Sequence, residues 1–247
     1  MSALVTDRGS LPARRVPLPV RLGADVHGWA VSMEEPMHEG ADRARVEAAV
    51  PATLQHAVSR RITSFLAGRL CATRALEAAG CRPCTSVATQ PDGAPEWPRG
   101  YVGSITHTDH FAAAVIASRT DRRGVGIDSE HVITSLVAAE IADEVCPELL
   151  ESGAAAGAAG PLTWSEQVTL AFSAKESLYK CVKPLGTDFF VFRDVRISDI
   201  DHAARRLRLC LLRDVGGGLA VGTLFDASFT IADAMVHTIV ELHPDAR

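Results

Sequence analysis

The stretch Phe172-Ser-Ala-Lys-Glu-Ser-Leu-Tyr-Lys180 decides how the chain arranges its charged residues, and it sits within a longer apolar pattern. Apolar residues recur at helical spacing from Thr163 to Val182, and Lys183-Pro184 supplies a stop. The spacing predicts one long helix on which Glu176 and Lys180 lie one turn apart. Such a pair can also be an ordinary surface ion pair worth about 0.2 to 0.5 kcal/mol. Taken alone, the pair therefore indicates no function.

A second charged stretch, Gly126-Ile-Asp-Ser-Glu130, follows an alternating pattern that predicts a strand. Residues two apart share a face of a strand, so Asp128 and Glu130 would point the same way. Together with Glu176, these carboxylates would form a hard oxygen site of the kind that Mg2+ prefers, and the neighbouring lysines need an anionic ligand such as phosphate. The combination predicts metal-assisted phosphoryl chemistry. Solvated carboxylates in a turn are the alternative interpretation.

Two further motifs precede these stretches, so that four charged or polar motifs occur in a fixed order. The four motifs are Trp97-Pro98, Gly103-Ser-Ile-Thr-His107, Gly126-Ile-Asp-Ser-Glu130 and Phe172-Ser-Ala-Lys-Glu-Ser-Leu-Tyr-Lys180. In order and spacing they resemble the 4'-phosphopantetheinyl transferases, and most of all the Sfp-type branch that contains the enterobactin synthetase component D proteins. The resemblance spans roughly residues 60–184, and four ordered motifs are far more specific than one.

The resemblance implies transfer of the phosphopantetheine arm of coenzyme A to a serine of an apo carrier protein, with release of adenosine 3',5'-bisphosphate. It implies that Asp128, Glu130 and Glu176 hold Mg2+, with Mn2+ as an alternative ion. Lys175 and Lys180 match lysines of the family motif, and we expect Lys180 to steady the leaving phosphate. The serine hydroxyl needs a base, for which Glu176 is the first candidate and Glu130 the second.

The segment before the apolar strand 111–117 supplies candidate contacts to coenzyme A. By resemblance, His107 would contact a phosphate, whereas a histidine bonded to backbone in a turn is the alternative. Ser104 could donate its hydroxyl, and Gly103 could let the backbone approach a ligand closely. The sequence departs from the family in the turn before Trp97, where the stretch 90–96 carries no cation. That departure puts one of the usual phosphate contacts in doubt.

Two arginines lie on a helix predicted over Pro51 to Ala79, with Pro51 in its first turn and Gly80 as its stop. Arg61 and Arg69 are eight residues apart, about 80° around the helix, so both can flank one edge of its apolar stripe. The resemblance implies that they grip the phosphates of coenzyme A, a contact that suits the guanidinium fork. Surface arginines that lie along apolar neighbours are the alternative.

Bulk properties agree with a folded protein but do not select a function. The chain has 247 residues, 47% of them hydrophobic, and a net charge of −5, which argues against a general nucleic-acid binder. No apolar run reaches the roughly 20 residues of a membrane span, and the N-terminus lacks a signal-peptide core, so we expect a cytoplasmic protein. The six cysteines include one close pair, Cys81 and Cys84, which supports zinc only weakly, and we expect reduced thiols.

The sequence predicts an α+β fold, and the resemblance implies two similar α+β halves, related by a pseudo-two-fold, with a coenzyme A cleft between them. We place the halves at residues 1–123, with the nucleotide contacts, and 124–247, with the metal and catalytic residues. The second half would contain a helix near Thr134 to Glu151, a loop from Gly153 to Gly160, and a hairpin that begins at 206–212. The first fifty residues carry no motif.

The function expected from the sequence is therefore Mg2+-dependent phosphopantetheinyl transfer by a monomer, with apo acyl, peptidyl or aryl carrier proteins as partners. Carriers of fatty-acid, polyketide and nonribosomal-peptide synthesis all present an acceptor serine, and the sequence does not choose among them. Two alternatives remain. One is a metal-dependent phosphohydrolase that uses water in place of the serine, and the other is a non-catalytic coenzyme A-binding module.

Overall fold

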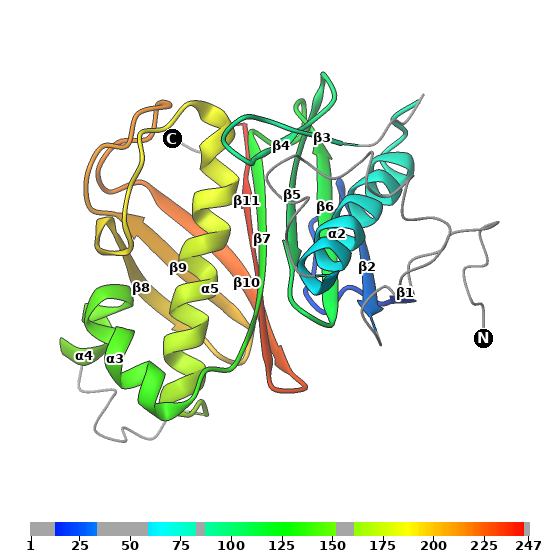
Figure 1. Ribbon diagram of the computed structural model, residues 1–247. Helices are drawn as coiled ribbons and strands as arrows, with labels where there is room; N and C mark the ends of the chain where they lie inside the picture. The colour runs from blue at the N-terminus through cyan, green and yellow to red at the C-terminus, as the bar shows by residue number, and fades with distance from the viewer. Residues whose placement is uncertain (1–12, 34–58, 83–86, 152–160, 245–247) are drawn as a thin grey trace. The chain divides into compact units, whose positions relative to one another are not determined.

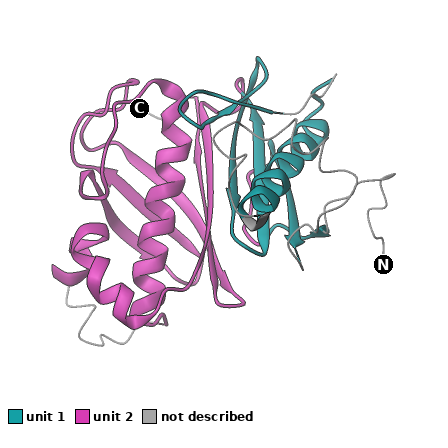
Figure 2. Cartoon of the chain, viewed as in Figure 1, with its two compact units in different colours: residues 1–18, 24–118 teal, residues 19–23, 119–247 magenta. Residues whose placement is uncertain are grey.

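The computed structural model describes residues 13–33, 59–82, 87–151 and 161–244. The chain divides into two compact units, each with its own sheet and helix (Figure 2). Unit 1 comprises Met1–Leu18 and Ala24–Ser118, and unit 2 comprises Pro19–Gly23 and Arg119–Arg247. The short segment Pro19–Gly23 therefore belongs to unit 2, although the strands on either side of it belong to unit 1.

Unit 1 is an antiparallel sheet of order β1-β2-β6-β5, with one long helix, α2, packed against it (Figure 1). Buried alanines at Ala67, Ala72 and Ala75 of α2 face Ala112 and Ala114 of β6 in one apolar cluster, and such small side chains let the helix approach the sheet closely. The elements are β1 Ala13–Val16, β2 Val26–Met33, α2 Ser59–Ala78, β3 Ala88–Thr89, β4 Pro95–Glu96, β5 Tyr101–His107 and β6 Phe111–Ser118.

Unit 2 is a five-stranded antiparallel sheet of order β7-β11-β10-β9-β8, and the long helix α5 crosses one of its faces (Figure 1). Alternate residues of the strands, such as Leu207, Leu209 and Leu211, point into the core that this helix covers. The elements are β7 Gly124–His131, α3 Ser135–Val145, α4 Pro147–Glu151, α5 Trp164–Val182, η3 Lys183–Leu185, η4 Phe192–Asp194, β8 Val195–Asp201, β9 Arg206–Leu211, β10 Leu224–Ala232 and β11 Met235–Leu242.

Local signals set both ends of α5. Thr163 caps the N-terminus: its hydroxyl accepts a hydrogen bond from the backbone N–H of Glu166, and the Glu166 carboxylate accepts one from the backbone N–H of Thr163. The α-helix ends at Val182, and the chain continues as the short 3-10 turn η3, which contains Pro184. The helix predicted from the apolar spacing is therefore confirmed, with both of its ends.

Two glycines of β7 let α5 lie directly on the strand. A Cβ atom at Gly126 would lie 1.8 Å from the backbone oxygen of Ser177, and one at Gly124 would lie 2.1 Å from that of Cys181. No side chain fits in that space, so glycine is required by close approach rather than by a turn. The contact fixes which residues of α5 stand beside which residues of β7.

Several sequence predictions can be compared with these elements. The mixed α+β class is confirmed, as are the strands predicted around residues 111–117 and 206–212. The single helix predicted near Thr134 to Glu151 is wrong, because the helix breaks at Cys146 and Pro147 begins the separate helix α4. The loop predicted from Gly153 to Gly160 and the start of the helix predicted from Pro51 lie outside the described residues.

The sequence analysis missed β1 and β2, which fall in the stretch that carries no motif. No helix among the described residues is both long and apolar enough to cross a membrane.

The glycine contact gives a stability prediction. Gly126→Ala should lower the free energy of unfolding by about 3 kcal/mol or more, because the added methyl group overlaps the α5 backbone, which cannot move without moving the whole helix. Urea unfolding measures the effect, and Asp199→Ala, at an exposed position of β8 in the same sheet, serves as the control. A Gly126→Ala variant as stable as the wild type would contradict the close packing of α5 on β7.

Candidate active site

The structure brings four of the predicted site residues together where α5 crosses β7. Asp128 and Glu130 share the face of β7 that α5 covers, and Glu176 and Lys180 project from α5. The Nζ atom of Lys180 lies 2.6 Å from Oδ1 of Asp128, whose residue is only 2% exposed. We call these four residues the carboxylate cluster.

A buried polar network holds the base of this cluster. The hydroxyl of Ser177 donates a hydrogen bond to the backbone oxygen of Thr238 on β11, which is the register partner of Asp128. The hydroxyls of Ser173 and Ser177 also lie 2.9 and 2.7 Å from Oγ1 of Thr238. Because all three side chains are fully buried and bonded, the helix cannot slide along the sheet without breaking these bonds.

Burial and the nearby charge of Asp128 raise the pKa of both glutamates in the cluster. Burial, followed by the negative charge of Asp128, raises the pKa of Glu130 to about 7, while Lys180 opposes the rise. Burial also raises the pKa of Glu176, with Asp128 adding to the rise and Lys180 opposing it. Three carboxyl groups thus share a single lysine, and that lysine opposes the rise in pKa of both glutamates.

The chemistry of the cluster fits a divalent cation. Oδ2 of Asp128 is buried, and it has no hydrogen-bond partner within the described part of the chain, whereas a buried carboxylate oxygen normally has one. Carboxylate oxygens are the ligands that Mg2+ prefers. Among the described residues, however, no three His, Cys, Asp or Glu side chains are already gathered as a ligand set. Side-chain rotation of Glu130 and Glu176 would have to complete one.

Lys175 does not join the cluster, although it is the neighbour of Glu176 in sequence. Its ammonium group is buried and donates to the backbone oxygens of Val145 at 2.7 Å and Phe192 at 3.1 Å, and it pairs with Glu148 at 3.0 Å. Burial lowers the pKa of Lys175, and the Glu148 carboxylate opposes that shift. The amine therefore ties α5 to α3, α4 and η4, and these three partners occupy its three N–H donors.

An apolar groove of about 360 Å³ begins at Glu176 and is one feature that the sequence analysis did not identify. Its walls are mainly aromatic: the rings of Phe189 and Phe190 meet Tyr179 edge to face, at centroid distances of 6.0 and 5.4 Å. Phe189 is 73% exposed, which is unusual for so large an apolar side chain. The apolar run 189–192 after the helix stop was the available signal.

In unit 1, Arg69 has the features of an anion ligand. Its Nη2 atom donates to Oγ1 of Thr89 at 2.7 Å, and the guanidinium lies over the ring of Phe65, 4.9 Å from the centroid. Nη1 is buried without a hydrogen-bond partner in the residues that the structure describes. Burial also lowers the pKa of Arg69. A buried guanidinium N–H group without a hydrogen-bond partner favours an anionic ligand at this point.

The other predicted contacts of unit 1 divide between the two faces of its sheet. A Cβ atom at Gly68 would lie 3.6 Å from Cδ2 of His107, so His107 borders α2 at Gly68, which precedes Arg69 in the sequence. Ser104 is buried and, by the alternation of β5, lies on the opposite face from His107. Arg61 is exposed in the first turn of α2 that is described. The structure therefore places His107 on the face of the sheet that α2 covers, and Ser104 on the other face.

Gly103 has a different role from the one expected. A Cβ atom there would lie 2.4 Å from the side chain of Ile116 and 2.9 Å from the ring of Trp97, so the missing side chain makes room for core packing rather than for a ligand.

The cysteines that the structure describes are free thiols, while Cys84 lies outside the described residues.

Comparison with known proteins decides the family. A model of the 4'-phosphopantetheinyl transferase N-terminal domain matches residues 48–117, and a model of the 4'-phosphopantetheinyl transferase superfamily matches residues 124–220. The 4'-phosphopantetheinyl transferase Npt of Nocardia iowensis is 30% identical over 196 residues, which are 74% of this chain and 83% of that protein. The chain belongs to the 4'-phosphopantetheinyl transferase superfamily.

Other members of the superfamily match shorter parts. Enterobactin synthase component D of Escherichia coli (strain K12) is 39% identical over 132 residues, which cover 52% of this chain and 58% of that protein. The 4'-phosphopantetheinyl transferase PptT of Mycobacterium tuberculosis is 30% identical over 145 residues, 59% of this chain and 61% of its own length. The chain thus spans less than two thirds of the length of the enterobactin synthase components. The resemblance read from the four motifs is confirmed.

The buried pair of Lys175 gives a second prediction. Lys175→Met or Glu148→Gln alone should each cost about 3 to 5 kcal/mol of unfolding free energy, because each change leaves the partner's charge buried and unpaired. The double variant should lose less than the sum of the two, and urea unfolding of all four proteins measures the coupling. A Lys175→Met variant that kept full stability but lost affinity for coenzyme A would instead make this lysine a ligand contact.

Proposed function

We propose that this protein transfers the 4'-phosphopantetheine group of coenzyme A to a serine hydroxyl of an apo carrier protein. The observation that supports this most is the carboxylate cluster, which stands at the crossing of α5 and β7 in a member of the transferase superfamily. The hydroxyl oxygen would attack the phosphorus that bears pantetheine, and a phosphodiester bond would form. The bond from that phosphorus to the leaving oxygen would break, and adenosine 3',5'-bisphosphate would depart.

The position of each residue in the carboxylate cluster suggests its role in the reaction. Glu176 belongs to the cluster and also lines the apolar groove, so it is the carboxylate best placed to accept the serine proton, while Glu130 remains the second candidate. Lys180 donates toward the cluster and would steady the negative charge of the leaving phosphate. Asp128, Glu130 and Glu176 would hold Mg2+, which would supply charge neutralisation on the pyrophosphate when bound.

The apolar groove beside Glu176 would hold the pantetheine arm. That arm is largely uncharged, and it extends from the phosphorus at which the reaction occurs, so it needs an apolar surface that begins beside the base. The groove meets this requirement because Glu176 and Tyr179 stand one turn apart on α5 and both line it. Binding energy along the arm would orient the phosphorus toward the serine.

The nucleotide end of coenzyme A would contact unit 1. Arg69, with its open buried donor, is the strongest candidate, and His107 lies beside the same helix. Arg61 is exposed and could reach a phosphate only from the rim. Ser104 and Lys175 remain candidates by resemblance alone, and neither position supports the assignment. The partners would be apo acyl, peptidyl or aryl carrier proteins, and a panel of such carriers would identify those that are served.

The catalytic assignment predicts a loss of turnover without loss of fold. Asp128→Asn or Glu176→Gln should lower the rate of carrier modification by at least about a hundredfold, because each replaces a charged oxygen and keeps the side-chain volume. The assay is the mass gain of an apo carrier incubated with coenzyme A and Mg2+, and removal of divalent ions with a chelator should stop it as well. Asp199→Asn, exposed on β8, is the control.

The same assay separates the alternatives. Release of adenosine 3',5'-bisphosphate without mass gain on any carrier would indicate a phosphohydrolase. Binding of coenzyme A without turnover would indicate a non-catalytic module. Near-normal modification by both variants would refute the assignment of the carboxylate cluster.

The nucleotide contact gives a separate prediction. Arg69→Ala should weaken the binding of coenzyme A by about tenfold to a hundredfold, which is the range for loss of one charge-assisted contact. If the partner is the 3'-phosphate, calorimetry should show a smaller loss for dephospho-coenzyme A. Equal losses would move the contact to the pyrophosphate. Arg74→Ala, on the same helix and paired with Glu77 at the surface, should leave both affinities unchanged.

A further inference from the structure

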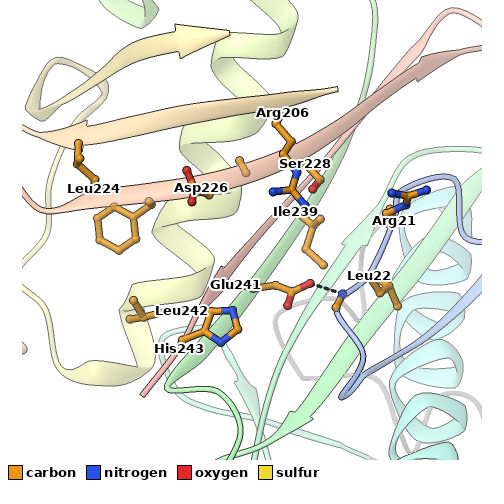
Figure 3. A pocket seen from close by; sticks show the side chains of 13 residues that line it. Arg21, Leu22, Arg206, Leu224, Asp226, Ser228, Ile239, Glu241, Leu242 and His243 are labelled. Carbon is orange, nitrogen blue, oxygen red and sulfur yellow. Dashed lines mark hydrogen bonds between the residues drawn. The ribbon is translucent and has the colours of Figure 1, made fainter. Parts of the chain in front are cut away.

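Unit 2 carries a second pocket, on the face of its sheet that α5 does not cover (Figure 3). The pocket measures about 280 Å³, and the segment 21–23 and strands β9, β10 and β11 line it. Arg206, Ser228 and Ile239 stand in one row across these strands, because they are successive register partners. The catalytic proposal uses none of these residues.

Glu241 builds one wall of the pocket by fastening the segment 21–23 to the sheet. Its carboxylate accepts a hydrogen bond from the backbone N–H of Gly23 at 2.7 Å, drawn as the dashed line in Figure 3. The same carboxylate pairs with Nε of Arg122 at 3.0 Å. A Cβ atom at Gly23 would lie 2.4 Å from Oε2 of Glu241 and 2.6 Å from Nη2 of Arg122, so a larger residue would have to displace the ends of these two side chains. The backbone that carries Arg21 is therefore held in place.

The acids and the arginines of the pocket differ in their pairing. Glu241 is engaged as described above, and Asp226 pairs with Arg208 at 3.0 Å. Arg21 and Arg206, by contrast, have no ion pair or side-chain hydrogen bond with any residue that the structure describes. The pocket thus presents two unpaired guanidinium groups, while its negative charges are already neutralised.

Apolar side chains complete the lining and limit the kind of ligand. Leu22, Leu224 and Ile239 border the pocket, and Leu224 is 51% exposed although it is a large apolar residue. A fully hydrated inorganic ion would leave this apolar surface uncovered. A ligand with an anionic head and a short apolar body would cover it and would also pair with the arginines.

We propose that this pocket binds a small amphipathic anion, whose carboxylate or phosphate head pairs with Arg21 and Arg206 and whose apolar body lies on Leu224 and Ile239. Ser228, between Arg206 and Ile239 in the row, donates its hydroxyl to the same head. The site lies on the other face of the sheet from the carboxylate cluster, and none of its lining residues is one that we assign to coenzyme A, so we expect both ligands to bind at the same time.

Calorimetric titration with octanoate, octyl phosphate and octanol tests the proposal on the full chain. Saturating coenzyme A is present so that the apolar groove beside Glu176 is filled. Both anions should bind and octanol should not, and the stronger anion identifies the preferred head. Arg21→Gln and Arg206→Gln should each raise the Kd by at least about tenfold, whereas Arg213→Gln, an exposed arginine paired with Asp194, should leave it unchanged.

The controls separate this proposal from the catalytic one. Asp128→Asn, which should stop turnover, should bind the anions with unchanged Kd. Circular dichroism confirms that each variant is folded. Equal binding of octanol, unchanged affinity in both arginine variants, or loss of anion binding when coenzyme A is added would overturn the proposal.

Discussion

The close contact between the backbone of α5 and strand β7 is the constraint on which the carboxylate cluster depends. Gly126 and Gly124 face the backbone oxygens of Ser177 and Cys181, so the strand and the helix run in opposite directions past each other. Two residues beyond Gly126, Asp128 comes within reach of the Lys180 side chain, and Glu130 is close enough to Glu176 for the two charges to interact. Any residue larger than glycine would separate the helix from the strand and so the carboxylates from one another.

The two lysines of the α5 motif show why a motif is not yet a site. Lys175 and Lys180 are five residues apart, which places them about 140° apart around a helix. Lys180 therefore points to β7, while Lys175 points into the side where α3, α4 and η4 meet. The spacing of the two lysines in the sequence predicts this angle. It does not predict that Glu148 and the backbone oxygens of Val145 and Phe192 lie on the side to which Lys175 points.

How much the sequence could predict follows from the range of the interactions involved. The ends of α5 depend on residues close to each end in the sequence, Thr163 and Glu166 at the start and Pro184 at the stop, and the sequence predicts both ends correctly. The packing of Trp97 against Gly103 depends on a tertiary contact. The environment of Arg69 depends on Thr89, which lies twenty residues away on β3. A strand of two residues is too short to show a periodic sequence pattern. The residues of the carboxylate cluster are therefore readable from the sequence, and their surroundings are not.

Strand β11 separates the two chemical surfaces of unit 2 by its pleat. Thr238 faces α5 and supports the carboxylate cluster, whereas its neighbour Ile239 faces the second pocket, which contains Arg21 and Arg206. One connection between the pocket and the cluster is the backbone ladder between β11 and β7, where Thr238 pairs with Asp128. If that ladder couples the sites, the coupling must be reciprocal, since a ligand that changes the affinity for coenzyme A is itself bound with an affinity changed by the same factor. Rigid pairing of two buried strands favours weak coupling, because such a ladder has no second arrangement for either ligand to select.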